Sequence, residues 1–185
     1  CVLYLHGNAS CRLEGVKVLA TCLLLGASVC AIDCSGSGRS QGEYVSLGAF
    51  EQHDCRALCE HLRATKRART LLLWGRSMGA VTALLCGARN EPGVVGVVAD
   101  SPFSSLRALC YDRVAKATKG VAGEGLLVDA VLGMVASSVR HRAGFDLDDC
   151  DALRALPAAR APALFIHGLR DDFIAPKHSR DLRGA

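Results

Sequence analysis

Apolar and polar positions along the chain alternate between short, continuously apolar runs and longer stretches with helical spacing. The short runs predict buried strands at residues 2–5, 28–32, 70–74, 94–99 and 163–166. The longer stretches predict helices at residues 11–25, 47–64, 78–89 and 105–142, and Pro176 predicts the start of another helix. Strands that are apolar throughout must be covered on both faces, so the pattern predicts an α/β fold with a mostly parallel sheet between helices. No repeat or low-complexity linker divides residues 1–185, which we therefore expect to form a single domain.

Each predicted strand leads directly into a polar or glycine-containing motif. These motifs are His6-Gly7-Asn8, Asp33–Gly36, Gly75-Arg76-Ser77, Asp100-Ser101-Pro102 and Gly168–Asp171. In a parallel sheet the carboxyl ends of the strands meet at one edge, and ligands bind beyond that edge. We therefore expect the five motifs to lie together and to contain the functional site.

The third predicted strand continues into the sequence Gly75-Arg76-Ser77-Met78-Gly79 and then into a helix rich in small residues. A G-x-S-x-G motif between a strand and a helix is typical of a nucleophilic serine on a sharp turn. Gly75 and Gly79 let the strand and the helix approach each other without Cβ clashes. The helix N-terminus favours negative charge at the Ser77 oxygen. The alternative, a tight turn that happens to carry a serine, is disfavoured by this placement.

Two backbone N–H donors are needed to stabilise the oxyanion that forms when a serine attacks a carbonyl group. The amide of Met78, the residue after the nucleophile, is the first donor that we expect. The second is expected from the loop after the first strand, with Asn8 as its supplier. His6 and Gly7 precede Asn8 in that loop, and we expect His6 to position it through hydrogen bonds rather than to transfer protons.

The acid of a catalytic triad must orient an imidazole and stabilise its cation. The last predicted strand runs into a loop with two adjacent carboxylates, Asp171 and Asp172. Asp171 is the preferred acid and Asp172 the alternative, because an acid that follows the nucleophile fits the chain order Ser, Asp, His. Both residues are also typical helix-capping residues. Asp100 is a further alternative acid, although we expect it to shape the pocket floor.

Together these motifs resemble the α/β-hydrolase superfamily, and in particular its serine-aminopeptidase-like branch. That branch includes α/β-hydrolase-domain enzymes that remove palmitoyl groups from proteins. The resemblance covers nearly the whole chain and rests on Tyr4–Asn8, Asp33–Ser40, Gly75–Gly79 and Asp100–Phe103. It implies a sheet of eight mainly parallel strands and a Ser–Asp–His triad without cofactor or metal. The implied substrates are esters, thioesters or amides, carried by small molecules, lipids or acylated proteins.

The sequence departs from this pattern at the histidine of the triad, which in the family follows one more strand after the acid. We expect that histidine beyond residue 185, because the chain looks cut at both ends. The histidines present lie on predicted helices or in glycine turns, at positions 6, 53, 61, 141, 167 and 178. Since a serine without a base is a poor nucleophile, the 185-residue chain itself is predicted to be nearly inactive.

Ten cysteines raise the question of disulfides or metal ligands. No C-x-x-C pair is present, and Cys55 and Cys59 lie one helical turn apart with no histidine placed to complete a zinc site. Cys22, Cys30 and Cys86 occupy apolar runs that suit a small hydrophobic residue. We therefore predict reduced, mostly buried thiols and favour a cytoplasmic location.

The formal charge of +4 is spread along the chain, and its densest basic stretch is residues 63–69. That stretch has no interleaved aromatic residues, which argues against nucleic-acid binding, and it is too small to predict binding to a membrane surface. The sequence shows neither a signal-peptide pattern nor an apolar run long enough to span a bilayer.

Residues 105–142 are predicted to form a helical insert that covers the pocket, with Phe103 near the pocket mouth. The apolar residues of the insert fit a core-facing helix stripe, which we prefer, or an acyl-chain contact. They are Leu126, Leu127, Val131, Met134 and Val135. The leading function is hydrolysis of acyl esters or thioesters, with peptide cleavage as a variant. The alternative is a non-catalytic scaffold that binds a ligand or a protein partner.

Overall fold

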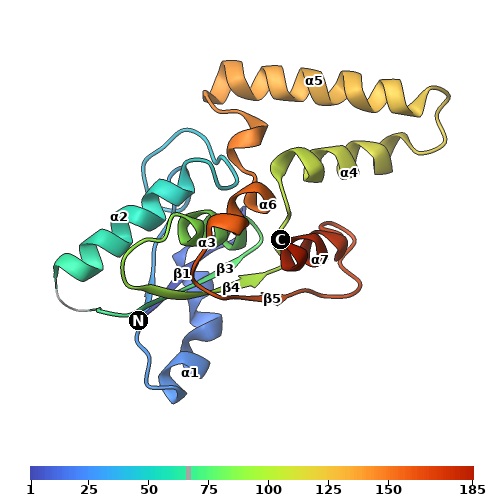
Figure 1. Cartoon of the computed structure of the whole chain (residues 1–185). Helices are drawn as coiled ribbons and strands as arrows, with labels where there is room; N and C mark the ends of the chain where they lie inside the picture. The colour runs from blue at the N-terminus through green and yellow to red at the C-terminus, as the bar shows by residue number, and fades with distance from the viewer. Residues whose placement is uncertain (66–67) are drawn as a thin grey trace.

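The continuously apolar runs form a parallel sheet that lies between helices, and its central strands are more buried than its edge strands (Figure 1). The structure is a computed structural model that describes residues 1–65 and 68–185. Its strands are β1 (Val2–Leu5), β2 (Val29–Ala31), β3 (Leu71–Arg76), β4 (Val94–Asp100) and β5 (Ala163–Ile166). They are arranged in the order β2-β1-β3-β4-β5, and every neighbouring pair is parallel. The predicted α/β fold is therefore confirmed, with five strands in the described residues.

The helical stretches also fold as predicted, with shifted boundaries. The α-helices are α1 (Val16–Leu24), α2 (Glu51–Ala64), α3 (Met78–Ala88), α4 (Leu106–Thr118), α5 (Glu124–Ala143), α6 (Ala152–Ala155) and α7 (Lys177–Gly184). The short 3₁₀ helices are η1 (Arg12–Gly15), η2 (Leu147–Asp149) and η3 (Leu156–Ala158). The predicted helix 47–64 begins only at Glu51, because the buried Glu51 carboxylate accepts the N–H groups of Ser46 and Gly48 at 2.8 Å.

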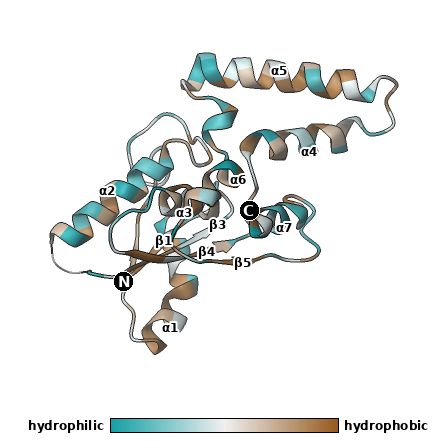
Figure 2. Ribbon diagram, viewed as in Figure 1, coloured by the Kyte–Doolittle hydropathy of each residue, from teal (hydrophilic) through white to brown (hydrophobic). Residues whose placement is uncertain are grey.

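The two faces of the sheet are covered unequally. Alternate residues of β1 and β3, such as Leu3 and Leu73, pack under α2 and α3 in the main core. Tyr4, on the opposite face, packs with Val18 and Cys22 of α1 in a smaller cluster. In Figure 2 the strands are among the most hydrophobic parts of the chain, whereas α2 and α7 carry much of the hydrophilic colour. The central strands are thus held from both sides, as parallel strands require.

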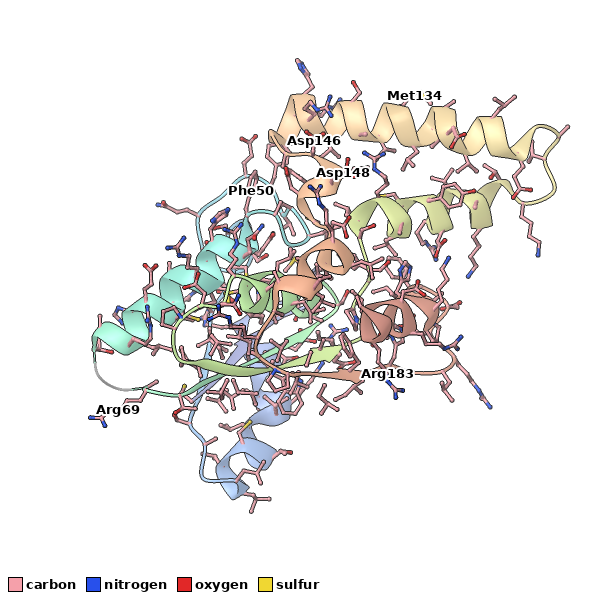
Figure 3. The ribbon with its side chains drawn as sticks, in the orientation of Figure 1. Phe50, Arg69, Met134, Asp146, Asp148 and Arg183 are labelled. Atoms are coloured by element: carbon pink, nitrogen blue, oxygen red, sulfur yellow. The ribbon has the colours of Figure 1, made fainter. Side chains whose placement is uncertain are left out.

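The predicted insert is a hairpin of two antiparallel helices, α4 and α5, which lies outside the sheet layers (Figure 1). The expected core-facing stripe is wrong for this hairpin, because α5 packs on α4 along one narrow side. Val128 and Leu132 form that side, whereas Leu126 is 83% exposed and Met134 is 64% exposed. Figure 3 shows Met134 on the outer surface of α5.

Phe103, predicted near the pocket mouth, is instead buried in the main core. It lies in the segment between β4 and α4, and its side chain belongs to the same buried cluster as Leu106 and Leu109 of α4. None of the helices in the described residues is long and apolar enough to cross a membrane.

Candidate active site

Ser77 lies on the sharp turn between β3 and α3 and has a backbone conformation that is unusual for a residue with a side chain. Its φ is 53° and its ψ is −116°, a strained combination for any residue other than glycine. The turn is held in place because the Ser77 amide donates to the Asp100 carbonyl at 2.8 Å. The Ser77 carbonyl accepts the amides of Ala80 and Val81 at 3.0 and 3.1 Å. Strain of this kind persists only where the surrounding structure fixes it, and it is common at functional sites.

The two glycines of the motif allow this turn to form. A Cβ atom at Gly75 would lie 2.0 Å from the carbonyl oxygen of Gly79, and one at Gly79 would lie 2.1 Å from that of Leu5. Both distances are far inside van der Waals contact. Absence of a side chain at these positions therefore brings the start of α3 against the end of β1, where the loop 6–10 begins.

The loop 6–10 carries the residues that we expected to face the nucleophile. In the described residues, the backbone amides of Asn8 and Met78 donate no hydrogen bond to a protein acceptor. Asn8 is exposed, and its side-chain oxygen accepts the Ala9 amide at 2.9 Å. Met78 is the first residue of α3, so its amide belongs to the unpaired N–H groups at a helix start. Two free donors are therefore available on adjoining segments.

His6 is completely buried beneath this loop. Its Nδ1 atom donates to the carbonyl of Gly7 at 2.8 Å, and its Nε2 atom accepts the amide of Cys34 at 3.1 Å. Both ring nitrogens are thus occupied by backbone groups, one in loop 6–10 and one in the loop after β2. In this arrangement His6 connects two loops and has no free nitrogen with which to accept a proton.

Glu14 makes a connection that the sequence analysis missed. It is 5% exposed, and its carboxylate accepts the Gly7 amide at 2.8 Å and the Arg76 Nε at 2.5 Å. Burial alone would raise the pKa of Glu14, but the hydrogen bonds from Gly7 and Arg76, with the Arg76 charge, outweigh it and lower the pKa. Nothing marks this residue in the sequence, because glutamate in the first turn of a helix is common.

The Glu14 carboxylate therefore joins the loop after β1 to the turn after β3. Arg76 is the residue between Gly75 and Ser77, and its guanidinium lies so close to Gly7 that a Cβ there would be 2.9 Å from it. Lys17 adds a second, mostly exposed cation 3.3 Å from the same carboxylate. The relative position of the loop and the nucleophile turn is thus set by an ion pair as well as by packing.

Asp171 follows β5, two strands from the nucleophile turn. One of its carboxylate oxygens accepts the amides of Phe173 and Ile174 at 3.0 and 2.9 Å, and the other lies 3.6 Å from His167 Nε2. The Asp171 side chain is 25% exposed, whereas that of Asp172 is 92% exposed and faces Lys116 of α4. The hydrogen bonds of Asp171 organise its own loop, and they do not cap α7, which begins at Lys177.

Asp100 lies at the end of β4, the strand between β3, which leads to Ser77, and β5, which leads to Asp171. Its carboxylate accepts the Ser101 hydroxyl at 2.9 Å, and the Ser101 amide donates to the Ile166 carbonyl at 2.8 Å. Together with the bond from the Ser77 amide, this joins the ends of β3, β4 and β5 in sequence. The motifs that were predicted at one edge of the sheet therefore do lie at neighbouring strand ends.

No histidine in the described residues hydrogen-bonds to Ser77. His167 Nε2 donates to the Ile174 carbonyl at 2.8 Å, and its Nδ1 lies 2.6 Å from the Ser179 hydroxyl. Three others, at positions 53, 61 and 141, are exposed on α2 and α5.

His178 contacts a serine and an aspartate, the residue types of a Ser–Asp–His triad, at a second place in the structure. Its Nδ1 lies 2.8 Å from the Ser104 hydroxyl, and its Nε2 lies 3.2 Å from an oxygen of Asp112. Ser104 and His178 are both buried, and burial lowers the pKa of His178 despite the opposing effect of Asp112. Ser104 also donates its own amide to the ring at 3.2 Å. These contacts attach α7 to α4 and to the segment that precedes it.

Known proteins resemble this chain in sequence and in fold. The sequence model of the family described as "Serine aminopeptidase, S33" matches residues 1–143. The uncharacterized protein YqkD of Bacillus subtilis is 30% identical over 176 residues, 94% of this chain and 55% of YqkD. The α/β-hydrolase domain-containing protein WAV2 of Arabidopsis thaliana is 23% identical over 95% of this chain and 53% of WAV2. This chain thus spans about half the length of the curated relatives it matches.

Solved structures share the fold at lower sequence identity. The Pyrococcus furiosus esterase Pf2001 superposes with a TM-score of 0.72 and 23% identity, over 99% of this chain and 66% of the esterase. Acetyl xylan esterase 1 of Thermoanaerobacterium gives a TM-score of 0.67 with 18% identity, over 99% of this chain and 64% of that enzyme. These similarities establish the α/β-hydrolase fold.

Proposed function

We propose that this chain, which belongs to the serine aminopeptidase S33 family, forms most of the catalytic domain of a serine hydrolase. Its reaction is hydrolysis of an acyl ester or thioester, with amide or peptide cleavage as a variant of the same chemistry. The observation that carries the proposal is the strained Ser77 between two glycines that cannot be replaced. Strain of this kind is common at functional sites, and on a turn from a strand to a helix it raises a nucleophile above the sheet.

In the proposed reaction, the Ser77 hydroxyl attacks the acyl carbonyl carbon and loses its proton to an imidazole. The amides of Met78 and Asn8 donate to the resulting oxyanion. As the intermediate collapses, the bond to the alcohol or thiol breaks and the leaving group takes the proton from the imidazolium. Water then attacks the acyl-serine with the imidazole as base, and releases the carboxylic acid and the free serine.

The imidazole of this reaction is proposed to come from the part of the full-length protein that lies outside residues 1–185. Both buried histidines near the strand ends, His6 and His167, already use their ring nitrogens in other hydrogen bonds. Asp171 is proposed to orient the incoming imidazole, since one of its oxygens is free of backbone hydrogen bonds. Asp172 and Asp100 are the weaker choices, the first because it faces solvent beside α4 and the second because it is bonded to Ser101.

Glu14 is proposed as a positioning residue of the same site. It touches neither the nucleophile oxygen nor the expected substrate position, but it holds Gly7 and Arg76 on the two segments that would supply the oxyanion donors. A donor that is displaced by a fraction of an ångström loses much of its effect on the transition state. Glu14 would therefore act on catalysis through Asn8 and Met78.

Esters are favoured over peptides as the substrate class. Pf2001 and acetyl xylan esterase 1 are described as esterases, and a similar protein of Paleococcus ferrophilus is described as a monoacylglycerol lipase. That protein superposes with a TM-score of 0.63 and 19% identity, over 98% of this chain and 77% of its own length. The alternative function, a non-catalytic scaffold that binds a ligand, is favoured only by the fact that no histidine of the described residues reaches Ser77.

Labelling of the full-length protein with a fluorophosphonate probe tests the proposal. We expect the parent protein to be labelled and Ser77→Ala to be unlabelled, because the probe captures an activated serine oxygen. Ser104→Ala is the matched control, since the hydroxyl of Ser104 lies 2.8 Å from His178 Nδ1 at a site away from the G-x-S-x-G motif in the sequence, and it should remain labelled. Absence of label on the parent protein would favour the scaffold, whereas label on Ser77→Ala would show that the nucleophile lies elsewhere.

A further inference from the structure

Three buried thiols lie close together between α2 and α3, near the C-terminal end of α3. Cys55 and Cys59 lie one turn apart on the buried side of α2, and Cys86 faces them from α3. Their sulfur atoms all lie within 4.8 Å of one another, and none of the three residues is exposed. The sequence showed only the first two of these residues together, because Cys86 is on another helix 27 or more positions away.

We propose that this cluster is a binding site for a divalent, thiophilic cation of the zinc class. Zinc binds cysteine sulfur at about 2.3 Å, which places three sulfurs of a tetrahedral shell about 3.8 Å apart. The three sulfurs lie within 4.8 Å of one another, so their separations exceed this spacing by no more than about 1 Å. A shift of this size is within the range of side-chain rotation.

The charge of the surroundings favours a divalent ion. A divalent ion held by three thiolates carries one net negative charge, and a buried net charge is costly unless it is matched. Arg63 lies one turn after Cys59 on α2, and its Nε atom is buried without a hydrogen-bond partner in the described residues. Its positive charge matches the complex with a divalent ion, whereas a monovalent cuprous ion would leave one negative charge unmatched.

The three thiols make up the whole ligand set that the described residues offer at this cluster. No fourth His, Cys, Asp or Glu belongs to the group in the described residues. The protein therefore offers three ligands, and a water molecule would complete a tetrahedral shell.

Binding would connect the two helices that flank the main core. The helix α3 starts directly after Ser77, so an ion between α2 and α3 would fix the helix that carries the nucleophile turn. Since the site is formed only in the folded chain, bound metal would stabilise the fold against unfolding. This inference is independent of the hydrolase chemistry and does not require the catalytic histidine.

The test uses the reduced, metal-free full-length protein. Titration with Cd²⁺, followed by thiolate-to-cadmium absorption, is expected to saturate at one ion per chain. Zn²⁺, which binds thiolates less tightly than Cd²⁺, is expected to compete with it only in excess, and Zn²⁺ alone is expected to raise the Tm of unfolding. Saturation at no defined stoichiometry, or an unchanged Tm at saturating Zn²⁺, would overturn the proposal.

Three variants locate the ion. Cys86→Ala should weaken binding by more than about 100-fold, beyond the 10–100-fold typical of losing an outer-shell partner. Cys22→Ala is the matched control, because Cys22 is equally buried but lies in the smaller cluster beneath the sheet, and its affinity should equal that of the parent. Arg63→Gln leaves all thiols in place, and should weaken binding by about 10-fold through lost charge matching. Equal losses in Cys22→Ala and Cys86→Ala, or parent affinity in both Cys86→Ala and Arg63→Gln, would contradict the assignment.

Discussion

The helix that follows Ser77 and the long helix of the insert are opposites in how far their surroundings constrain them. All eleven residues of α3 are buried, and a Cβ at its Gly79 would overlap the backbone of β1. In α5 only Val128 and Leu132 of twenty residues are buried, and a Cβ at its Gly133 would meet nothing within 4 Å. Nearly any substitution in α3 must therefore be accommodated by the core, whereas α5 can accept many substitutions.

The same difference separates the part of the molecule whose geometry is fixed from the part that can vary. The nucleophile turn is fixed by backbone contacts among β1, β3 and α3, so its geometry depends little on which side chains lie beyond it. The insert and the loop after β5 are held by a few side-chain contacts at the surface, such as Arg113 and Lys116 to the Asp172 carbonyl. We infer that chemistry belongs to the first region and substrate choice to the second.

The largest expected effect is that of Asp171→Asn in the full-length protein. Hydrolysis of a p-nitrophenyl ester should fall by about 10³–10⁴-fold, because a neutral amide cannot hold the imidazole in the correct tautomer or stabilise its cation. The fold should be preserved, since the asparagine oxygen still accepts the amides of Phe173 and Ile174.

Asp172→Asn and Asp100→Asn are the matched controls for that substitution. Asp172 is almost fully exposed, and its variant should retain activity within about threefold, a difference below 1 kcal/mol. If either control lost as much activity as Asp171→Asn, or if only a control lost it, the acid would have to be reassigned.

A second, smaller effect separates the two helices directly. Gly79→Ala should destabilise the chain by about 3 kcal/mol or more, at the upper limit of overpacking, because its new methyl group meets backbone atoms that cannot rotate away. Gly133→Ala, in the open middle of α5, should stabilise it by about 0.5–1 kcal/mol through the better helix propensity of alanine. Urea unfolding of both variants measures the contrast, and similar free-energy changes would show that the two helices are equally constrained.

The contrast between these helices explains how much could be predicted from sequence. The nucleophile turn could be predicted because it depends only on residues that are neighbours in the sequence. Strand, turn and helix follow one another within ten residues, and the two glycines mark the place where the strand and the helix approach each other. The stripe predicted on α5 was wrong because burial there depends on which distant segment packs against it. Spacing identified a helix with apolar residues, but not the single side on which α4 lies.

Pairings between distant residues were invisible for a related reason. Glu14 and Arg76 are 62 positions apart, and each has an ordinary local explanation, in a first helical turn and in a variable position of the motif. Cys86 likewise fits an apolar helix by itself, and its proximity to Cys55 and Cys59 emerges only when α2 and α3 pack. The partners of His178, which are Ser104 and Asp112, were likewise not foreseen.

The smallest expected effect concerns the ion pair beneath the nucleophile turn. Glu14→Gln should cost about 2 kcal/mol at neutral pH, less than the 3–5 kcal/mol of a fully buried pair, because the Arg76 side chain is 40% exposed. The control is Glu60→Gln, since Glu60 pairs with Arg56 on the surface of α2 with both side chains about half exposed. That variant should change stability by less than about 0.5 kcal/mol.

The difference in unfolding free energy between the parent and Glu14→Gln is expected to depend on pH in one direction. The pKa of Glu14 is lower in the folded chain than the usual value of about 4.3, so folding favours the ionised form. The stabilisation is therefore fully present above about pH 4.3 and is lost as the pH falls through the folded pKa. Unfolding free energies of parent and Glu14→Gln should converge in that acidic window and remain apart from pH 5 to 8, as measured by urea titration at each pH. A gap that instead widened on acidification would mean that Glu14 is protonated in the folded chain, and that Gly7 and Arg76 are not held by a carboxylate.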